Sequence, residues 1–252
     1  MTAGVFDDHL DAWQREQESP WGRLRYSVVR HTLDRTIGDR LGMRVLDLGG
    51  GDAADSARLA VDHDVTVHDF SAPLLARAQQ RDPRLTTVLG DLDEAQGEWD
   101  LVLCHNVVQY RTDVRATVRA VADLVAPGGH LSLLAPNPAG EVIAALVREQ
   151  DPARARALLD APTQQMVTFQ YDVRRVEADH VEAQLRDRGL TTTARYGIRC
   201  ANDLLADDAR KRDPAFWAEL EQLEIDLCDR EPWVRTGRFW QLVSTRPHST
   251  ER

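Results

Sequence analysis

An acid followed by three glycines stands at the end of a short apolar run. Residues 44–48 read Arg-Val-Leu-Asp-Leu, and Gly49, Gly50 and Gly51 follow at once. Glycines let the backbone come close to a ligand, and a carboxylate at the end of a buried strand can meet a cationic amine. Asp47 and the glycines therefore suit S-adenosylmethionine (SAM), which carries an ammonium and a sulfonium group but no phosphate.

The same residues also satisfy a dinucleotide-binding fingerprint. Gly49, Gly51 and Ala54 fit the pattern G-x-G-x-x-A, and Asp69 follows at about 20 residues, as in such sites. Against this, Asp47 would place a carboxylate near the pyrophosphate of a dinucleotide, which is electrostatically unfavourable. The pattern therefore favours SAM, with a dinucleotide and a glycine turn without a ligand as the alternatives.

Three more polar positions follow predicted strands. Asp69 ends the second strand, where a carboxylate can accept from both ribose hydroxyls; the alternative is a helix N-cap, which Ser71 fits better. Asp91 ends the third strand and, with Leu92, can flank the adenine and accept from its amine, or it is an ordinary loop acid. His105 follows the fourth strand and can contact the methionine part or the acceptor, unless it is a hydrogen-bonded core histidine.

Short apolar runs alternating with helical stretches must position these residues. Strands are predicted at residues 44–48, 65–70, 85–89, 101–104, 131–135, 192–198 and 238–244. Helices are predicted at residues 6–15, 21–41, 54–63, 72–81, 114–125, 173–188 and 214–228, and a partly helical, exposed region at residues 141–165. This alternation predicts an α/β fold with a doubly wound, mostly parallel sheet of seven strands.

The chain has the length of one α/β domain. Its 252 residues suffice for a full core with insertions but not for two independent domains. We therefore expect a single domain with N-terminal helices (1–42), a cofactor-binding core (43–138), a helical cap (139–190) and C-terminal strands with a helix (191–246).

The composition argues against several classes of function. No apolar stretch approaches the ~18–20 residues of a membrane span, and acids rather than a signal sequence stand at the N-terminus, so we expect a cytoplasmic protein. The 3 cysteines and 8 histidines are scattered without metal-ligand spacing, which predicts no metal site. With 31 basic against 41 acidic residues, the net charge of −10 repels polyanions except at local basic clusters.

The residues also carry a family resemblance. Residues 99–105 and 124–131 resemble the fourth strand and a helix-to-strand turn of class I SAM-dependent methyltransferases, and the whole chain resembles the bacterial tRNA 5-carboxymethoxyuridine methyltransferases. That likeness rests on Phe6-Asp7-Asp8, Gly22-Arg23-Leu24-Arg25, residues 44–51, Asp69-Phe70-Ser71-Ala72, His105, Pro127-Gly128-Gly129, Gly197-Ile198-Arg199, Arg212-Asp213, Glu231-Pro232-Trp233 and Gly237-Arg238. It implies a Rossmann-like fold and esterification of a carboxylate on a modified wobble uridine.

The resemblance further implies which residues contact the cofactor: Arg25, Gly49, Gly50, Asp69, Phe70, Leu92 and His105. Arg25 would belong to an N-terminal helix that folds over the cofactor and would pair with its carboxylate; on the sequence alone it would be part of a solvated helix face. The lysine-rich cap stretch of some family members is replaced by a nearly balanced set, Arg148, Arg154, Arg156, Asp151 and Asp160. The predicted acceptor is therefore tRNA or a small carboxylate-bearing molecule.

Methyl transfer from a sulfonium is an in-line displacement, so the protein mainly aligns the acceptor and excludes water. A carboxylate acceptor is ionised at neutral pH and needs no general base, and arginines can grip it instead. Tyr196, Arg199 and Arg238 are the candidates, with surface charges on strand ends as the alternative. Residues 104–107 are not of the N-P-P-Y type, which argues against an adenine amine as acceptor. A small-molecule O- or N-methyltransferase and a non-catalytic SAM-binding module are the other functions that fit.

Overall fold

A seven-stranded sheet forms the centre of the computed structural model, which describes residues 10–166 and 171–248. Its strands lie in the order β3-β2-β1-β4-β5-β9-β8, and β9 runs antiparallel to both neighbours while the others are parallel. Their bounds are β1 Arg44–Leu48, β2 Asp64–Asp69, β3 Thr86–Leu89, β4 Trp99–His105, β5 Val125–Pro136, β8 Thr191–Ile198 and β9 Phe239–Thr245. The predicted doubly wound sheet of seven mostly parallel strands is confirmed.

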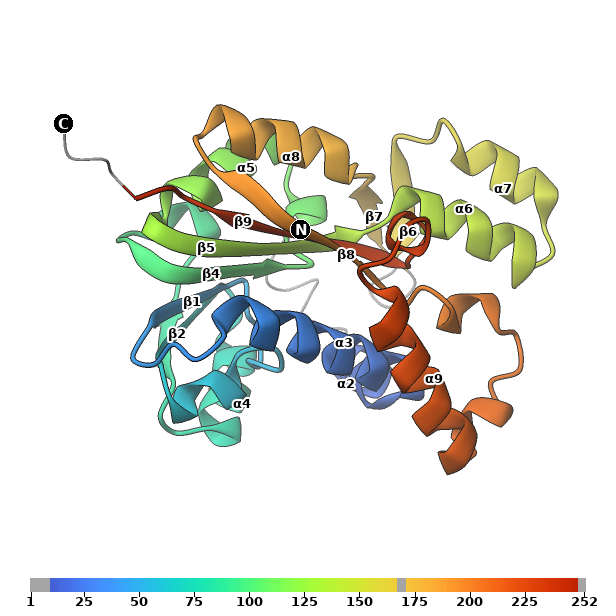
Figure 1. The fold of residues 1–252 in the computed structure, drawn as a ribbon, viewed down its shortest axis with the longest axis horizontal. Helices are drawn as coiled ribbons and strands as arrows, with labels where there is room; N and C mark the ends of the chain where they lie inside the picture. The colour runs from blue at the N-terminus through green and yellow to red at the C-terminus, as the bar shows by residue number, and fades with distance from the viewer. Residues whose placement is uncertain (1–9, 167–170, 249–252) are drawn as a thin grey trace.

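Helices cover both faces of this sheet (Figure 1). One face packs against α3 (Pro20–Ile37), α4 (Ala72–Arg81) and α9 (Pro214–Leu227), the other against α5 (Val114–Asp123) and α8 (Ala178–Asp187). Strands with both faces covered are apolar nearly throughout, which is why β1 and β4 read as continuous apolar runs in the sequence. The strand order reverses between β1 and β4, so a crevice is expected beyond the carboxyl ends of these two strands.

The N-terminal helices fold back on each other beside this crevice. α2 (Leu10–Glu18) ends where Ser19 caps α3, the Ser19 hydroxyl accepting from Gly22 N at 3.0 Å. Any side chain at Gly22 would overlap the Glu16 carbonyl, so the glycine permits the tight corner. The helix predicted at 6–15 extends to Glu18, and its first residues lie outside the described part. The helix predicted to reach residue 41 ends at Ile37.

Two predicted helices are wrong in part. Residues 54–63 form turns and a short 3₁₀-helix, η1 (Ala57–Val61), because Ala53 takes a positive φ of 60° and the backbone turns to bring Asp55 and Ser56 inward. Residues 173–188 were expected to be one helix, but β7 (Tyr171–Arg174) pairs antiparallel with β6 (Thr163–Met166) before α8 begins. The pairing of β6 with β7 satisfies backbone hydrogen-bonding groups of both strands.

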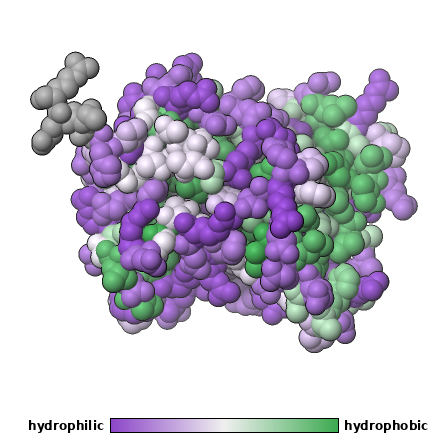
Figure 2. Space-filling view, viewed as in Figure 1, coloured by the Kyte–Doolittle hydropathy of each residue, from purple (hydrophilic) through white to green (hydrophobic). Residues whose placement is uncertain are grey.

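The cap consists of two short helices beside the hairpin. α6 (Pro138–Val147) and α7 (Pro152–Leu158) begin with proline, and the side chains of Asn137 and Asp151 cap them. On the face shown in Figure 2, apolar side chains gather over this end of the molecule, and the exposed ones include Leu146, Val147 and Leu159. None of the described helices is long and apolar enough to span a membrane.

Candidate active site

The carboxyl ends of the parallel strands open into a cavity of about 1490 Å³. α2 and α3 border it on one side, and α6 with the loop after β8 borders it on the other. All the predicted cofactor residues line it: Arg25, Asp47, Gly49, Gly50, Gly51, Asp69, Phe70, Asp91, Leu92 and His105. Arg199 and Arg238 also line it, whereas Tyr196 does not. Among the residues that the structure describes, no group of three or more metal-ligating side chains is assembled.

Asp47 and the glycine turn form the floor of the cavity at the end of β1. The Asp47 carboxylate is 2% exposed and accepts from Ser56 Oγ at 2.5 Å. A Cβ at Gly50 would lie 2.5 Å from Asp47 Oδ2, and one at Gly49 would lie 2.6 Å from a methyl of Val107. The glycines are therefore needed for the close approach of the backbone. Burial raises the pKa of Asp47 to about 7, although the Ser56 hydrogen bond acts in the opposite direction.

Asp69 ties the glycine turn to the end of β2. Its Oδ2 accepts from Gly51 N at 3.0 Å and its Oδ1 accepts from Ser71 N at 2.8 Å. Ser71 caps α4 through its own hydroxyl, as the sequence suggested, so Asp69 is not needed for that role. With Phe70 next to it, Asp69 is held in place on the cavity wall.

Asp91 has a partner that the sequence did not indicate. Its carboxylate accepts from Arg111 at 2.9 Å and from Asp93 N at 3.2 Å, capping the 3₁₀-helix η2 (Leu92–Glu94). Burial is the largest single effect on this carboxylate and acts to raise its pKa, but the hydrogen bonds from Asp93 N and Arg111 together outweigh it, so the pKa of Asp91 is lowered. Leu92 is buried beside it and offers an apolar wall. The contacts of Asp91 thus agree with an ordinary loop acid. Its position on the cavity wall agrees with the other interpretation, a residue that flanks the adenine.

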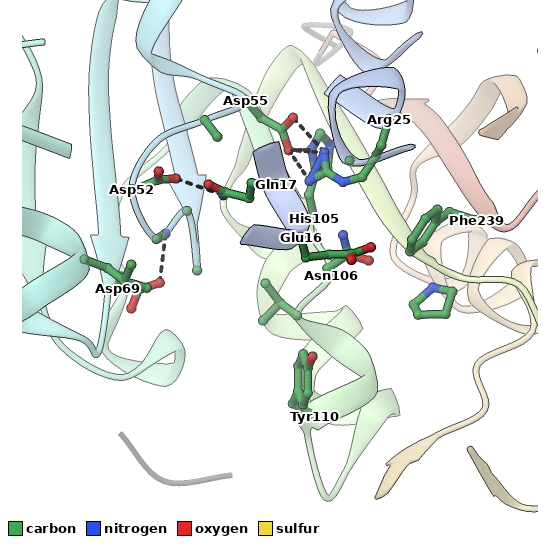
Figure 3. Close-up of a pocket in the computed structure, with 18 of the residues that line it drawn as sticks. Glu16, Gln17, Arg25, Asp52, Asp55, Asp69, His105, Asn106, Tyr110 and Phe239 are labelled. Carbon is green, nitrogen blue, oxygen red and sulfur yellow. Dashed lines mark hydrogen bonds and ion pairs between the residues drawn. The ribbon is translucent and has the colours of Figure 1, made fainter. Parts of the chain in front are cut away.

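A buried cluster of charges lies between the glycine turn and α3 (Figure 3). Arg25 binds Asp55 in a bidentate manner, with N–O distances of 2.8 Å to 3.1 Å, and His105 Nδ1 lies 2.9 Å from Asp55 Oδ2. Burial disfavours both charges, yet the attraction outweighs it, so the pKa of Arg25 is raised and that of Asp55 is lowered. Arg25, expected on the cofactor carboxylate, is therefore bound to a carboxylate of the protein in this structure.

Sequence reasoning missed Asp55 and its neighbours. Asp52 accepts from Gln17 of α2 at 3.3 Å, so the side chain of Gln17 bridges the N-terminal helices to the glycine turn (Figure 3). Asp55 and Ser56 stand in the segment predicted to be a helix, and Asp52 lies just before it. The only sequence feature that pointed to them is the cluster of acids directly after the glycines. Acids are also typical of the first turn of an exposed helix, so the feature did not distinguish the two cases.

Asn106 is a second residue that the sequence reasoning passed over. It follows β4 with a positive φ of 57°, a conformation that asparagine tolerates better than most residues, and its N–H donates to Leu134 O at 2.8 Å. Its Oδ1 is buried without a hydrogen-bond partner among the described residues. Strained backbone and an unsatisfied polar atom at the wall of a cavity are features of ligand sites.

Arg199 and Arg238 lie together at the end of the cavity remote from the glycine turn. Arg199 pairs with Asp203 through both carboxylate oxygens and lies over the Phe239 ring, 5.6 Å from its centroid. Arg238 N donates to Arg199 O at 3.0 Å, which joins the two backbones. The Arg238 guanidinium has neither an ion pair nor a hydrogen bond within the described part of the chain, and burial lowers its pKa despite nearby Asp203. Acids lie near this cation, but none of those described is bonded to it directly.

The prediction that Tyr196 belongs to this wall is wrong. Tyr196 lies on the α3 side of β8, in the hydrophobic core, and is only 4% exposed. The Arg35 guanidinium lies over its ring, 5.6 Å from the centroid. Side chains alternate across a strand, so Tyr196 faces the helices whereas Arg199, three positions later in the loop after β8, faces the cavity.

Glu224 of α9 anchors the loop that carries Arg199. Its fully buried carboxylate accepts from Cys200 N at 2.5 Å, Ala201 N at 3.0 Å and Asn202 N at 2.7 Å. These three bonds hold the chain directly after Arg199, whose φ is +62°. The position of Arg199 in the cavity therefore depends on a residue outside it.

Glu224→Gln is expected to lower the free energy of unfolding by about 2 kcal/mol, because an amide nitrogen would face N–H groups that need an acceptor. Urea unfolding at neutral pH measures this. Glu219→Gln, the same change on an exposed part of α9, should change the value by no more than about 0.5 kcal/mol. Equal stabilities of the two variants would contradict the anchoring role.

Known proteins share this fold and much of the sequence pattern. A methyltransferase-domain family matches residues 46–131. The tRNA 5-carboxymethoxyuridine methyltransferase of Escherichia coli (strain K12) is 27% identical over 267 aligned residues, covering 98% of this chain and 98% of that protein. The magnesium protoporphyrin IX methyltransferase of Synechocystis PCC 6803, solved with S-adenosylhomocysteine (SAH), has a TM-score of 0.63 and 17% identity over 94% of each chain. An N-methyltransferase from Bradyrhizobium japonicum WM9, also with SAH, has a TM-score of 0.58 and 17% identity over 93% of this chain and 91% of that one.

Proposed function

Since the chain is a class I SAM-dependent methyltransferase, we propose that it methylates a carboxylate oxygen of its acceptor and so forms a methyl ester. The observation that carries the proposal is the guanidinium of Arg238, which has no ion pair or hydrogen bond among the described residues and lies at the end of the cavity remote from the glycine turn. A half-buried cation without an ion pair is unfavourable, and an anionic group on the acceptor would compensate it. Arg199 stands beside it but already has Asp203.

In this proposal the glycine-turn half of the cavity holds the cofactor. Asp47 receives the ammonium group, and the close backbone of Gly49 to Gly51 admits the cofactor next to it. Asp69 accepts from the ribose hydroxyls, while Phe70, Asp91 and Leu92 surround the adenine. Arg25 and His105 lie at the methionine end, and Arg25 keeps N–H groups beyond the three hydrogen bonds that it gives to Asp55.

Bound SAM supplies an electrophilic methyl group on its sulfonium, and the chain contributes alignment. A carboxylate is already ionised at neutral pH, so no residue has to remove a proton from it. Arg238 orients the carboxylate by charge-assisted hydrogen bonds, and Asn106, between the two halves of the cavity, borders the path of transfer. The proposal thus assigns no general base.

Two classes of acceptor fit this site, each for a specific reason. The full-length likeness to a tRNA 5-carboxymethoxyuridine methyltransferase supports a carboxylate on a modified tRNA base as the acceptor. Such an acceptor fits the cytoplasmic location that the sequence predicts. The charges along the cavity favour a small carboxylic acid, because three of the arginines that line it are paired within the chain: Arg111 with Asp91, Arg148 with Asp208, and Arg154 with Glu149. Paired arginines offer little to a phosphate backbone.

Methyl transfer to defined acceptor pools tests the proposal. The purified chain is incubated with methyl-labelled SAM and either tRNA that contains 5-carboxymethoxyuridine or a panel of small carboxylic acids. Label in the tRNA assigns the enzyme to tRNA modification, and label in the acids alone assigns it to metabolite methylation. Label only in amines or phenols from a third panel would contradict the carboxylate proposal.

The affinity for SAM is expected to rise about tenfold between pH 5.5 and pH 7. A cationic ligand favours ionised Asp47, whose pKa is about 7 without ligand, so binding below this pH releases a proton from Asp47 and is weakened. Isothermal titration calorimetry at the two pH values measures the change. Asp47→Asn should bind more weakly and with a flat profile over this range; an equal slope in both proteins would show that another group titrates.

A further inference from the structure

We infer that Ser132 and Gln241, two buried side chains outside the cavity, act as positioning residues for cofactor binding by fixing the protonation of His105. Gln241 Nε2 lies 2.8 Å from Ser132 Oγ, and Ser132 Oγ lies 2.8 Å from His105 Nε2. On its other side, His105 Nδ1 meets Asp55, which holds Arg25. The inference concerns the cofactor half alone and does not depend on the acceptor.

These side chains form one continuous line of hydrogen bonds through the sheet. It starts on α3, where Thr32 Oγ1 lies 2.8 Å from Gln241 Oε1, and crosses β9 and β5 before it reaches His105 at the end of β4. Thr32, Ser132 and Gln241 are fully buried. Water therefore cannot replace a missing partner, and each proton in the line has to match its neighbours.

The groups at the two ends, the Gln241 amide and the Asp55 carboxylate, decide which group donates in each hydrogen bond. The amide nitrogen of Gln241 can only donate, so Ser132 Oγ accepts from it and gives its own single proton to His105 Nε2. A nitrogen that accepts carries no proton. Nδ1 must carry one, because the ionised Asp55 carboxylate can only accept. His105 is thus held as a neutral imidazole with its proton on Nδ1.

The opposite order is the competing arrangement. If the Gln241 amide were reversed, Ser132 would donate to the amide oxygen and Thr32 Oγ1 would accept from the amide nitrogen. The Thr32 hydroxyl would then donate to Val29 O, which lies 2.9 Å away. His105 would then have to donate from Nε2 as well as from Nδ1 and would be a cation. A second cation next to Arg25 would share the single charge of Asp55 and would oppose a cofactor that carries a sulfonium. Ser132 and Gln241 keep His105 neutral and so prevent this second positive charge.

Ser132→Ala removes the donor to Nε2, so nothing keeps a second proton off that nitrogen, while Nδ1 still donates to Asp55. A cationic His105 would compete with Arg25 for the single charge of Asp55, and the pairing of Asp55 with Arg25 would loosen. We expect the dissociation constant of SAH to rise about tenfold. Ser244→Ala is the matched control, since Ser244 is equally buried, lies on β9 and bonds only Thr192, remote from the cavity; its affinity for SAH should equal that of the unchanged chain.

Nitrogen-15 NMR of the histidine-labelled full chain tests the inference directly, with His105→Gln to assign the signals. The unchanged chain and Ser244→Ala should show His105 with protonated Nδ1 and bare Nε2; Ser132→Ala should lose this pattern and bind SAH more weakly by calorimetry. A doubly protonated or Nε2-protonated His105 in the unchanged chain would overturn the inference, as would unchanged SAH affinity in Ser132→Ala. Should Ser132→Ala not fold, Ser132→Cys, a poor donor of similar shape, replaces it with the same expected direction.

Discussion

Replacing Gly50 by alanine is expected to weaken SAM binding by about 100-fold, equivalent to about 2.7 kcal/mol. The added methyl would lie 2.5 Å from Asp47 Oδ2 and 2.8 Å from Oδ1, so the carboxylate has to leave its position. It cannot do so easily, because it is buried and hydrogen-bonded to Ser56. The change therefore removes both the backbone approach and the acid that the proposal assigns to the ammonium group.

Calorimetry with SAM measures this effect, and Gly38→Ala is its control. Gly38 has a positive φ of 59° but open space where a Cβ would lie, and it ends α3 away from the cavity. That variant should lose about 1 kcal/mol of stability through backbone strain and keep its affinity. Normal SAM binding by a folded Gly50→Ala would contradict the placement of the cofactor at the glycine turn.

Arg238→Ala is expected to reduce kcat/KM for the acceptor by about 100-fold to 1000-fold while SAM affinity stays the same. Arg238 lines the end of the cavity remote from Asp47, and its guanidinium is the one that the proposal gives to the acceptor carboxylate. Because partial burial without an ion pair disfavours the charged side chain, its removal should not lower the free energy of unfolding. Loss of turnover without loss of stability is the signature of a residue kept for binding.

Steady-state kinetics and urea unfolding, run on the same preparations, check both parts. Arg235→Ala provides the control, since this arginine lies three residues earlier, is exposed and pairs with Glu231. It should keep full turnover. If Arg238→Ala also turned over normally, the carboxylate would have to be bound elsewhere; a large loss of stability would instead mean that the guanidinium has a structural role.

The sheet could be predicted from the sequence because its signals are local. Strands buried on both faces are short apolar runs with turn residues at their ends, as at Leu46 and Leu103. Parallel strands also place their carboxyl ends at one edge, so Asp47, Asp69 and His105 could be brought together before any contact was known. The cofactor half of the cavity follows from these two facts.

The charged cluster could not be predicted, because its contacts join distant parts of the chain. Asp55 was hidden in a segment whose spacing of alanines suits a helix, yet its partners are Arg25 of α3 and His105 of β4. The same holds for Tyr196, since only the packing of α3 against β8 decides which face of the strand is buried. The lack of a partner for Arg238 likewise depends on where Asp203 and Glu141 come to lie.

The chemical lability of the transferred methyl group tests the central claim most directly. The chain is allowed to methylate its best acceptor with methyl-labelled SAM, and the product is freed of excess SAM and treated with dilute alkali at moderate temperature. A methyl ester is cleaved under these conditions, so the proposed function predicts release of the label as methanol. Label that stays on the acceptor through this treatment would identify an ether or an N-methyl group and would contradict methylation of a carboxylate.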